Sequence, residues 1–212
     1  MGNIKLEIHQ VGMISTNCYF IINKDTNECI VVDPGDNADG LYEKIMRNGY
    51  KPVAIILTHG HFDHILAVNP LKRLTKVPVM AYEEEKEMLK DTKPRFTAMV
   101  KDNQDLVVEP DRFFKNEEEV TLGGITFKVL HTPGHSSGSC CYYLQEEGIL
   151  ISGDTLFEGS IGRTDFPTGS MQQLDKSLNE VLMKLPDDVE VYPGHGGQTT
   201  IGAERKYNPY VR

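Results

Sequence analysis

A chain of 212 residues with 39% hydrophobic side chains and no long apolar run is large enough to bury a core, and it predicts a globular protein with one domain over residues 1–212. Its formal net charge of −9 is the wrong sign for holding a phosphate backbone, so we expect no nucleic-acid partner. The first ten residues contain no signal-peptide core, and no run is long enough to span a membrane. Four cysteines without metal-type spacing indicate reduced thiols and a cytoplasmic protein.

The first third of the chain predicts strands and one helix. Alternating or continuous apolar residues mark the strands, and a turn signal at residues 33–35 ends the third of them. A helix is expected from Ala38 to about Asn48, because its apolar positions fall on one face. The strands are expected over residues 4–8, 18–22, 29–32 and 53–57.

The middle of the chain is less regular. A helix is expected over residues 65–74, although Pro70 would kink it or mark a fresh start. A short strand over 77–80 and a charged helix over 82–90 follow, and the charge run of this helix is expected to form a solvated face. Residues 91–118 predict an irregular connection between two halves of the molecule.

The last part of the chain repeats the sequence of strands, helix and strand. Two hairpins are expected, the first of which turns at a Gly-Gly pair. Two β-rich halves with helices outside are the natural packing of such a pattern. The expected strands are 120–122, 125–130, 140–144, 149–152 and 189–192, and the expected helices are 172–185 and 200–207.

Three histidines and one aspartate crowd into positions 59–64, directly after the strand 53–57. The carboxyl ends of strands are where open α/β layers place their chemistry. His59 and His61 are two residues apart and can point the same way, while Asp63 and His64 are offset toward a neighbouring direction. Because the chain has only seven histidines, chance scattering on a surface loop is a poor explanation. One short loop could therefore serve two adjacent metal ions.

Three later side chains complete the expected site. His135, Asp154 and His195 each follow an expected strand and lie beside a glycine, which lets the backbone turn sharply next to a ligand. The full set of five histidines and two aspartates suits zinc, or iron or manganese where these are available. We interpret His131 as structural, because it ends its strand before the turn, and His9 as an ordinary surface residue.

Four short motifs, at residues 58–64, 132–135, 153–155 and 193–195, together resemble the metallo-β-lactamase superfamily over nearly the whole chain. They read Thr-His-x-His-x-Asp-His, Thr-Pro-Gly-His, Gly-Asp-Thr and Pro-Gly-His. The resemblance implies an α+β fold, a four-layer αβ/βα sandwich of two mixed β-sheets flanked by helices. Within the superfamily the pattern is similar to the glyoxalase II (hydroxyacylglutathione hydrolase) group, especially its short bacterial members.

The resemblance also implies the ligands of two zinc ions, with iron or manganese as alternatives. Asp33 would support a ligand from behind rather than bind a metal. Asp154 stands where lactamases of the main class carry cysteine, and His61 where the oxygen-reducing diiron members carry glutamate, which disfavours both relatives. Carried over by position, the first ion would be held by His59, His61 and His135, the second by Asp63, His64 and His195, and the bridge between them would be Asp154.

The expected function is dinuclear hydrolysis of a thioester of the hydroxyacyl-glutathione type, with Asp63 and Asp154 in the catalytic centre. A hydroxide held between the ions would attack the carbonyl carbon. A thiol with a pKa of about 8.5 departs as thiolate, so no general acid is needed. Since the helical region that gives longer glyoxalase II enzymes their glutathione contacts is not among the residues after His195, we expect tolerance toward the thiol carrier.

Two alternatives to a thioester hydrolase stay open. Residues 159–166 resemble a segment shared by short glyoxalase II proteins and by persulfide dioxygenases, which use a single iron. A non-catalytic metal-binding scaffold is disfavoured, because it would not need the open coordination positions of a catalytic metal.

Arg163 could anchor a substrate carboxylate with its planar fork, and an ion pair with Asp165 or another loop carboxylate is the other interpretation.

Overall fold

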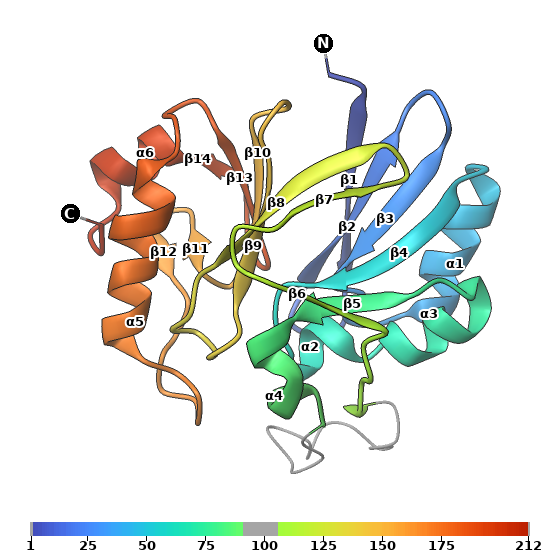
Figure 1. The fold of residues 1–212 in the computed structure, drawn as a ribbon, viewed down its shortest axis with the longest axis horizontal. Helices are drawn as coiled ribbons and strands as arrows, with labels where there is room; N and C mark the ends of the chain where they lie inside the picture. Colours follow the sequence, from blue (N-terminus) through green and yellow to red (C-terminus); the bar gives the residue numbers. More distant parts are fainter. Residues whose placement is uncertain (1, 91–105, 212) are drawn as a thin grey trace.

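The computed structural model describes residues 2–90 and 106–211, whose strands form two six-stranded mixed sheets packed face to face (Figure 1). In the first sheet the strands lie in chain order, and the pairs from β3 to β6 are parallel. In the second sheet the β10–β13 pair is parallel and the remaining pairs are antiparallel. The first sheet consists of β1 (Ile4–Val11), β2 (Thr16–Asn23), β3 (Glu28–Val32), β4 (Lys51–Leu57), β5 (Val79–Tyr82) and β6 (Arg112–Phe114). The second consists, in spatial order, of β14 (Thr199–Thr200), β13 (Glu190–Pro193), β10 (Ile149–Gly153), β9 (Cys140–Leu144), β8 (Ile125–His131) and β7 (Glu119–Leu122).

Helices cover the outer face of each sheet, which confirms the predicted four-layer αβ/βα sandwich of the α+β class. The outer face of the first sheet packs on α1 and α3, and that of the second on α5 and α6 (Figure 1). A small two-stranded sheet lies between β10 and α5 in the chain. The helices are α1 (Ala38–Arg47), α2 (Phe62–Ile65), α3 (Val68–Thr75), α4 (Lys86–Lys90), α5 (Met171–Lys176) and α6 (Ile201–Tyr207), and the small sheet pairs β11 (Leu156–Phe157) with β12 (Ser160–Ile161).

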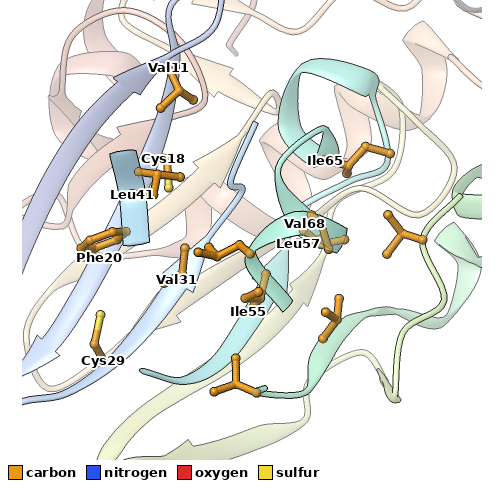
Figure 2. Packing of buried hydrophobic residues seen from close by; sticks show 14 of the residues in the cluster. Val11, Cys18, Phe20, Cys29, Val31, Leu41, Ile55, Leu57, Ile65 and Val68 are labelled. Carbon is orange, nitrogen blue, oxygen red and sulfur yellow. The ribbon is translucent and has the colours of Figure 1, made fainter. Parts of the chain in front are cut away.

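Strand β2 shows how one sequence serves two layers of the core. All of its residues are buried, because both faces of the first sheet are covered. Successive side chains of a strand point to opposite faces, so Tyr19 and Ile21 pack between the sheets while Cys18 and Phe20 pack against the helices. Figure 2 shows this outer cluster, in which Cys18 and Phe20 lie near Leu41 of α1. The four cysteines of the chain are buried and form no disulfide.

The expected helix over 82–90 differs from the structure. Strand β5 continues to Tyr82, a 3-10 turn follows over Glu83–Glu85, and α4 begins only at Lys86. The expectation that the whole charge run is solvated is wrong, because Glu85 is only 1% exposed. Met88 and Leu89, three and four residues later, are buried as well, so the three side chains share one helical face.

Several strands are a few residues longer than or shifted from their predicted ranges, and three other segments differ more from the sequence predictions. The helix expected over 65–74 is split into α2 and α3, and Pro70 lies in the first turn of α3, where its missing N–H is not needed. The irregular connection expected over 91–118 lies partly outside the described residues, and its end contains β6, which pairs with β5. The helix expected over 172–185 is α5 followed by a π turn and a 3-10 turn. No helix in the described ranges combines the length and apolarity that crossing a membrane requires.

Hydrogen bonds join the two sheets at the end where the predicted site lies. The Tyr142 hydroxyl of β9 donates to the Leu57 carbonyl of β4 at 2.5 Å, and the Cys140 amide donates to the Thr58 carbonyl at 3.0 Å. On the other side, the Tyr19 hydroxyl donates to the Pro193 carbonyl at 2.5 Å. The ends of strands from both halves of the chain are therefore fixed to one another directly beside the histidine loop.

We predict that Tyr142→Phe lowers the free energy of unfolding by about 1–2 kcal/mol, because it removes a buried hydrogen bond without removing the ring. Urea denaturation of the metal-free protein measures the change. Tyr143→Phe is the matched control, since the described residues contain no hydrogen bond of the Tyr143 hydroxyl and we expect almost no change. Equal loss of stability in the two variants would contradict the assigned role of the sheet junction.

Candidate metal centre

The loop after β4 places four predicted site residues within one turn of backbone. His59 and His61 lie in the segment before α2. His61 is the N-cap residue of this helix, and its backbone dihedral angles lie in the β region. Asp63 and His64 follow in the first turn of α2, so they leave the backbone in another direction. The structure brings these four side chains together with His135 from the β8–β9 loop, Asp154 after β10 and His195 after β13.

A first cluster contains three buried histidines, His59, His61 and His135, whose ligand atoms lie within 4.8 Å of one another. His61 Nδ1 lies 2.8 Å from His135 Nε2. Burial lowers the pKa of His59 below its usual range and that of His61 to about 3, so these rings are neutral near pH 7. Neutral imidazole nitrogens are the form that binds a metal.

A second cluster combines a carboxylate with two histidines, Asp63, His64 and His195. Asp63 Oδ2 lies 3.3 Å from His64 Nε2 and 3.2 Å from His195 Nε2. Burial alone would lower the pKa of His64, but the neighbouring carboxylates of Asp63, Asp154 and Asp33 raise it above its usual range. Unlike the all-histidine cluster, this one has negative charge of its own.

Asp154 lies between the two clusters. Its Oδ1 is 3.4 Å from His64 Nε2 and its Oδ2 is 3.5 Å from His135 Nε2. Gly194 makes this approach possible, because a Cβ atom there would lie 2.1 Å from Asp154 Oδ1. One carboxyl group is thus within reach of ligand atoms from both clusters.

Several buried polar atoms of the clusters have no hydrogen-bond partner in the described residues. Buried polar atoms are normally paired, so several unpaired ones within the two clusters indicate a binding site for a partner such as a metal ion. The donor set of imidazole and carboxylate groups fits such an ion and supports a dinuclear metal site. The unpaired atoms are His59 Nε2, His61 Nε2, His64 Nε2 and Asp154 Oδ1.

Asp33 lies behind the second cluster and is 2% exposed. It accepts hydrogen bonds from the Thr58 amide at 2.8 Å and the Thr58 hydroxyl at 2.5 Å, and its Oδ2 lies 2.9 Å from His64 Nδ1. Although Asp33 is also close enough to His59 and His64 to share an ion with them, both of its oxygens are already engaged. Its geometry is that of a group that orients His64 and fixes which nitrogen carries the proton.

The remaining histidines lie outside the clusters. His131 stacks on Tyr82 with ring centroids 4.3 Å apart, and its Nε2 lies 2.9 Å from the Ser137 carbonyl. His9 is not an ordinary surface residue, because its side chain is only 12% exposed and lies between Glu7 and Lys44. The burial of β1 does not follow its alternating sequence, since Glu7 and His9 are half-buried while Ile8 is exposed, so this packing of His9 was not predictable from the pattern.

A cleft with a volume of about 520 Å³ opens onto both clusters, and its other walls are mainly aromatic and aliphatic. Arg163 also lines it, but its guanidinium donates two hydrogen bonds of 2.7 Å to Asp165 and lies 4.1 Å from the centre of the Phe166 ring. The ion pair is therefore present in the structure. The wall residues apart from Arg163 and the metal-ligand types are Ile14, Phe62, Phe157 and Phe166.

Three polar residues that hold the site loops were not predicted from the sequence. The Thr16 hydroxyl donates to Asp63 Oδ2 at 3.0 Å, and the Asn17 side chain donates to the carbonyls of Pro193 and Gly196. Nothing local marks either residue, because their partners are 47 or more positions away. Glu85 is the third, and the apolar residues at its third and fourth following positions were the signal that it faces inward.

Comparison with known proteins gives a consistent result. Residues 11–195 match the Metallo-beta-lactamase superfamily. Among similar sequences, the hydroxyacylglutathione hydrolase GloC of Haemophilus influenzae is 36% identical, and the alignment covers 98% of each chain. Among solved structures, the BLEG-1 B3 metallo-beta-lactamase is 39% identical with a TM-score of 0.90, covering 98% of this chain and 99% of the other. TTHA1623 in a di-iron-bound form is 33% identical with a TM-score of 0.86, covering 97% and 100%.

We predict that Asp33→Asn weakens binding of one metal ion by about 10- to 100-fold, although it is nearly isosteric. The amide oxygen must face the Thr58 amide, so the new NH₂ group faces His64 Nδ1. His64 then has to accept at Nδ1 and carry its proton on Nε2, the atom directed into the second cluster. Titration of the metal-free protein with zinc against a chromophoric chelator measures the affinity.

The matched control is Asp36→Asn, which changes a half-buried carboxylate just before α1 that accepts the Asn37 amide. It should bind both ions as the parent does. Parental affinity in Asp33→Asn would show that Asp33 does not set the tautomer of His64.

Proposed function

Because the chain belongs to the metallo-beta-lactamase superfamily, we propose that this metal-dependent hydrolase holds two ions and cleaves thioesters of the hydroxyacyl-glutathione type. The observation that carries the proposal is the position of Asp154. Its two oxygens lie near His64 of one cluster and His135 of the other, which suits a carboxylate that bridges two ions. A site for one ion would not need a carboxylate between two complete ligand sets.

The proposed ligands follow the two clusters. The imidazole and carboxylate groups suit zinc, and the similarity to a di-iron-bound protein keeps iron as an alternative. Thr16 would orient Asp63, because its hydroxyl donates to the Asp63 carboxylate. Asp33 would orient His64, because its carboxylate accepts from the imidazole ring. The first ion would be bound by His59, His61 and His135, the second by Asp63, His64 and His195, and both by Asp154.

When bound, two such ions supply a nucleophile at neutral pH by lowering the pKa of water and polarise a carbonyl oxygen. The protein contributes the positions of the seven ligands and a cleft with apolar walls. Phe62, Phe157 and Phe166 line this cleft and would limit the access of bulk water to a bound carbonyl. Low local polarity strengthens the electrostatic interactions on which the reaction depends.

The cleft also favours a leaving group that needs no proton. The carboxyl groups among its described lining residues are Asp63 and Asp154, and both are assigned to the metal ions. No other acid in that lining stands ready to protonate an amine. A thiol, with a pKa of about 8.5, leaves as a thiolate, whereas an amide nitrogen requires protonation. Similarity to the GloC hydrolase supports a glutathione thioester as one member of the substrate class.

The proposed partner is thus a small thioester molecule. Four buried cysteines without a disulfide support our placement of the protein in the reducing cytoplasm.

We predict that His64→Ala and His195→Ala each abolish most thioester hydrolysis and lower the metal content from about two ions per chain toward one. Each substitution removes one of the three ligands of the second ion while the first cluster keeps all of its own. Elemental analysis gives the metal content, and thiol release gives the activity. His9→Ala serves as the control, because His9 packs between Glu7 and Lys44 outside the clusters and its loss should change neither quantity.

The same measurements test the persulfide dioxygenase alternative. A mononuclear iron site would use His59, His135 and Asp154 and leave positions open for oxygen. Should the parent bind a single iron, consume oxygen with glutathione persulfide and keep this activity after His195→Ala, the hydrolase proposal is wrong.

We predict that short acyl thioesters are hydrolysed at rates within about tenfold of glutathione thioesters, because the walls of the cleft are mainly apolar and its arginine is already paired with Asp165. A panel of thioesters measured by thiol release tests this, with a cephalosporin added because of the similarity to the BLEG-1 lactamase. We expect the cephalosporin to be the poorest substrate. Turnover restricted to the glutathione thioester would show that residues of this chain recognise the carrier.

A further inference from the structure

Glu85 is a buried acidic residue that the proposed reaction does not use. It ends the 3-10 turn after β5, and its carboxyl group meets donors from two loops that are distant in sequence. Oε1 accepts the Gly60 amide at 2.7 Å. Oε2 accepts the Gly138 amide at 2.9 Å and the Ser136 hydroxyl at 3.0 Å. One carboxyl group therefore ties the β4–α2 loop to the β8–β9 loop.

Those two loops carry all three histidines of the first cluster. Gly60 lies between His59 and His61 in the chain, and Ser136 directly follows His135. A shift of either loop would change the 2.8 Å separation of His61 Nδ1 and His135 Nε2. We propose that Glu85 is a positioning residue that holds these loops at the spacing required by one of the two metal ions. This inference rests on the metal site of the proposed function.

The packing around Glu85 leaves little room for the loops to move. A Cβ atom on Gly138 would lie 2.3 Å from the Glu85 backbone nitrogen, so only glycine lets this loop approach. A Cβ atom on Gly60 would lie 3.0 Å from Leu89 Cδ2 of α4. Hydrogen bonds to a carboxylate are stronger than those between neutral groups, and here they are buried. The 3-10 turn and α4 thus pack closely against both loops.

The second cluster is held by other residues. Thr16 donates to Asp63, Asp33 contacts His64, and Asn17 donates to the carbonyls on either side of His195. The hydrogen bonds that Glu85 accepts from Gly60, Ser136 and Gly138 involve none of these groups. A change at Glu85 should consequently disturb one ion and leave the other in place.

Glutamine cannot replace Glu85, despite its similar size. The two carboxylate oxygens face backbone amides on opposite sides, from Gly60 and from Gly138. A glutamine can turn its oxygen toward only one of them, so its NH₂ group must face the other donor. One loop then loses its acceptor and has to move away.

The experiment compares Glu85→Gln with Glu204→Gln in the full-length chain. Glu204 is the matched control, because it is a buried glutamate like Glu85, with 3% of its surface exposed. It accepts hydrogen bonds from the Gly159 amide, the Thr199 hydroxyl and the Asn208 amide group. Its contacts lie outside both loops of the first cluster. Each metal-free protein is titrated with zinc against a chromophoric chelator, and its fold and thermal midpoint are followed by circular dichroism.

We expect Glu85→Gln to bind one of its two zinc ions about 10- to 100-fold more weakly and the other with parental affinity. Glu204→Gln should lose thermal stability but bind both ions as the parent does. Ser136→Ala removes a single donor to Glu85 and should weaken the same ion to a smaller extent. If Glu85→Gln does not fold, the zinc titration of Ser136→Ala tests the inference instead.

The inference is overturned if Glu85→Gln binds both ions normally, if it loses both to the same extent, or if Glu204→Gln loses zinc equally at a similar thermal midpoint. A parent that binds two zinc ions but hydrolyses no thioester overturns the proposed function alone. A parent that binds no metal overturns both.

Discussion

The site depends on the junction between the two sheets at the ends of β4 and β9. There the Cys140 amide donates to the Thr58 carbonyl at 3.0 Å, and at a second junction, between β2 and the end of β13, the Asn17 amide donates to the Gly194 carbonyl at 2.8 Å. The first of these backbone bonds joins the end of β4 to the start of β9, and the second joins the start of β2 to the loop after β13. Each bond thus connects one half of the chain to the other. Because backbone bonds in a buried junction leave little freedom, ligand atoms from four loops can meet within a few ångströms.

The ligand types were predictable because their signal is local. Each follows a strand whose apolar run is visible in the sequence, and glycine marks the turns beside His135, Asp154 and His195. The residues that hold these loops were not predictable in the same way. Glu85 lies in a run of three glutamates, and only its distance from Met88 and Leu89 separates it from its solvated neighbours. The layered fold follows from hydrophobic pattern, whereas the split of α2 from α3 is decided by tertiary packing.

The two clusters are electrostatically different. The first contains neutral histidines whose pKa values burial lowers, while the second has the carboxylate of Asp63 and shares that of Asp154. Burial would lower the pKa of His64, but the carboxylates of Asp63, Asp154 and Asp33 raise it. Because a histidine must be deprotonated to bind a metal ion, metal binding at the second cluster would be coupled to proton release.

The walls of the cleft have a different physical task from its base. At the base, the carboxylate and imidazole groups of the two clusters are held by hydrogen bonds from behind, as His64 is by Asp33. Toward the opening, aromatic rings dominate, and Arg163 is paired with Asp165 above Phe166. Apolar walls discriminate weakly between substrates that differ by a few methylene groups. Selection of a thioester over an amide would then come from the departure of the thiolate at the base, and the walls would set only the size and apolarity of the acyl group.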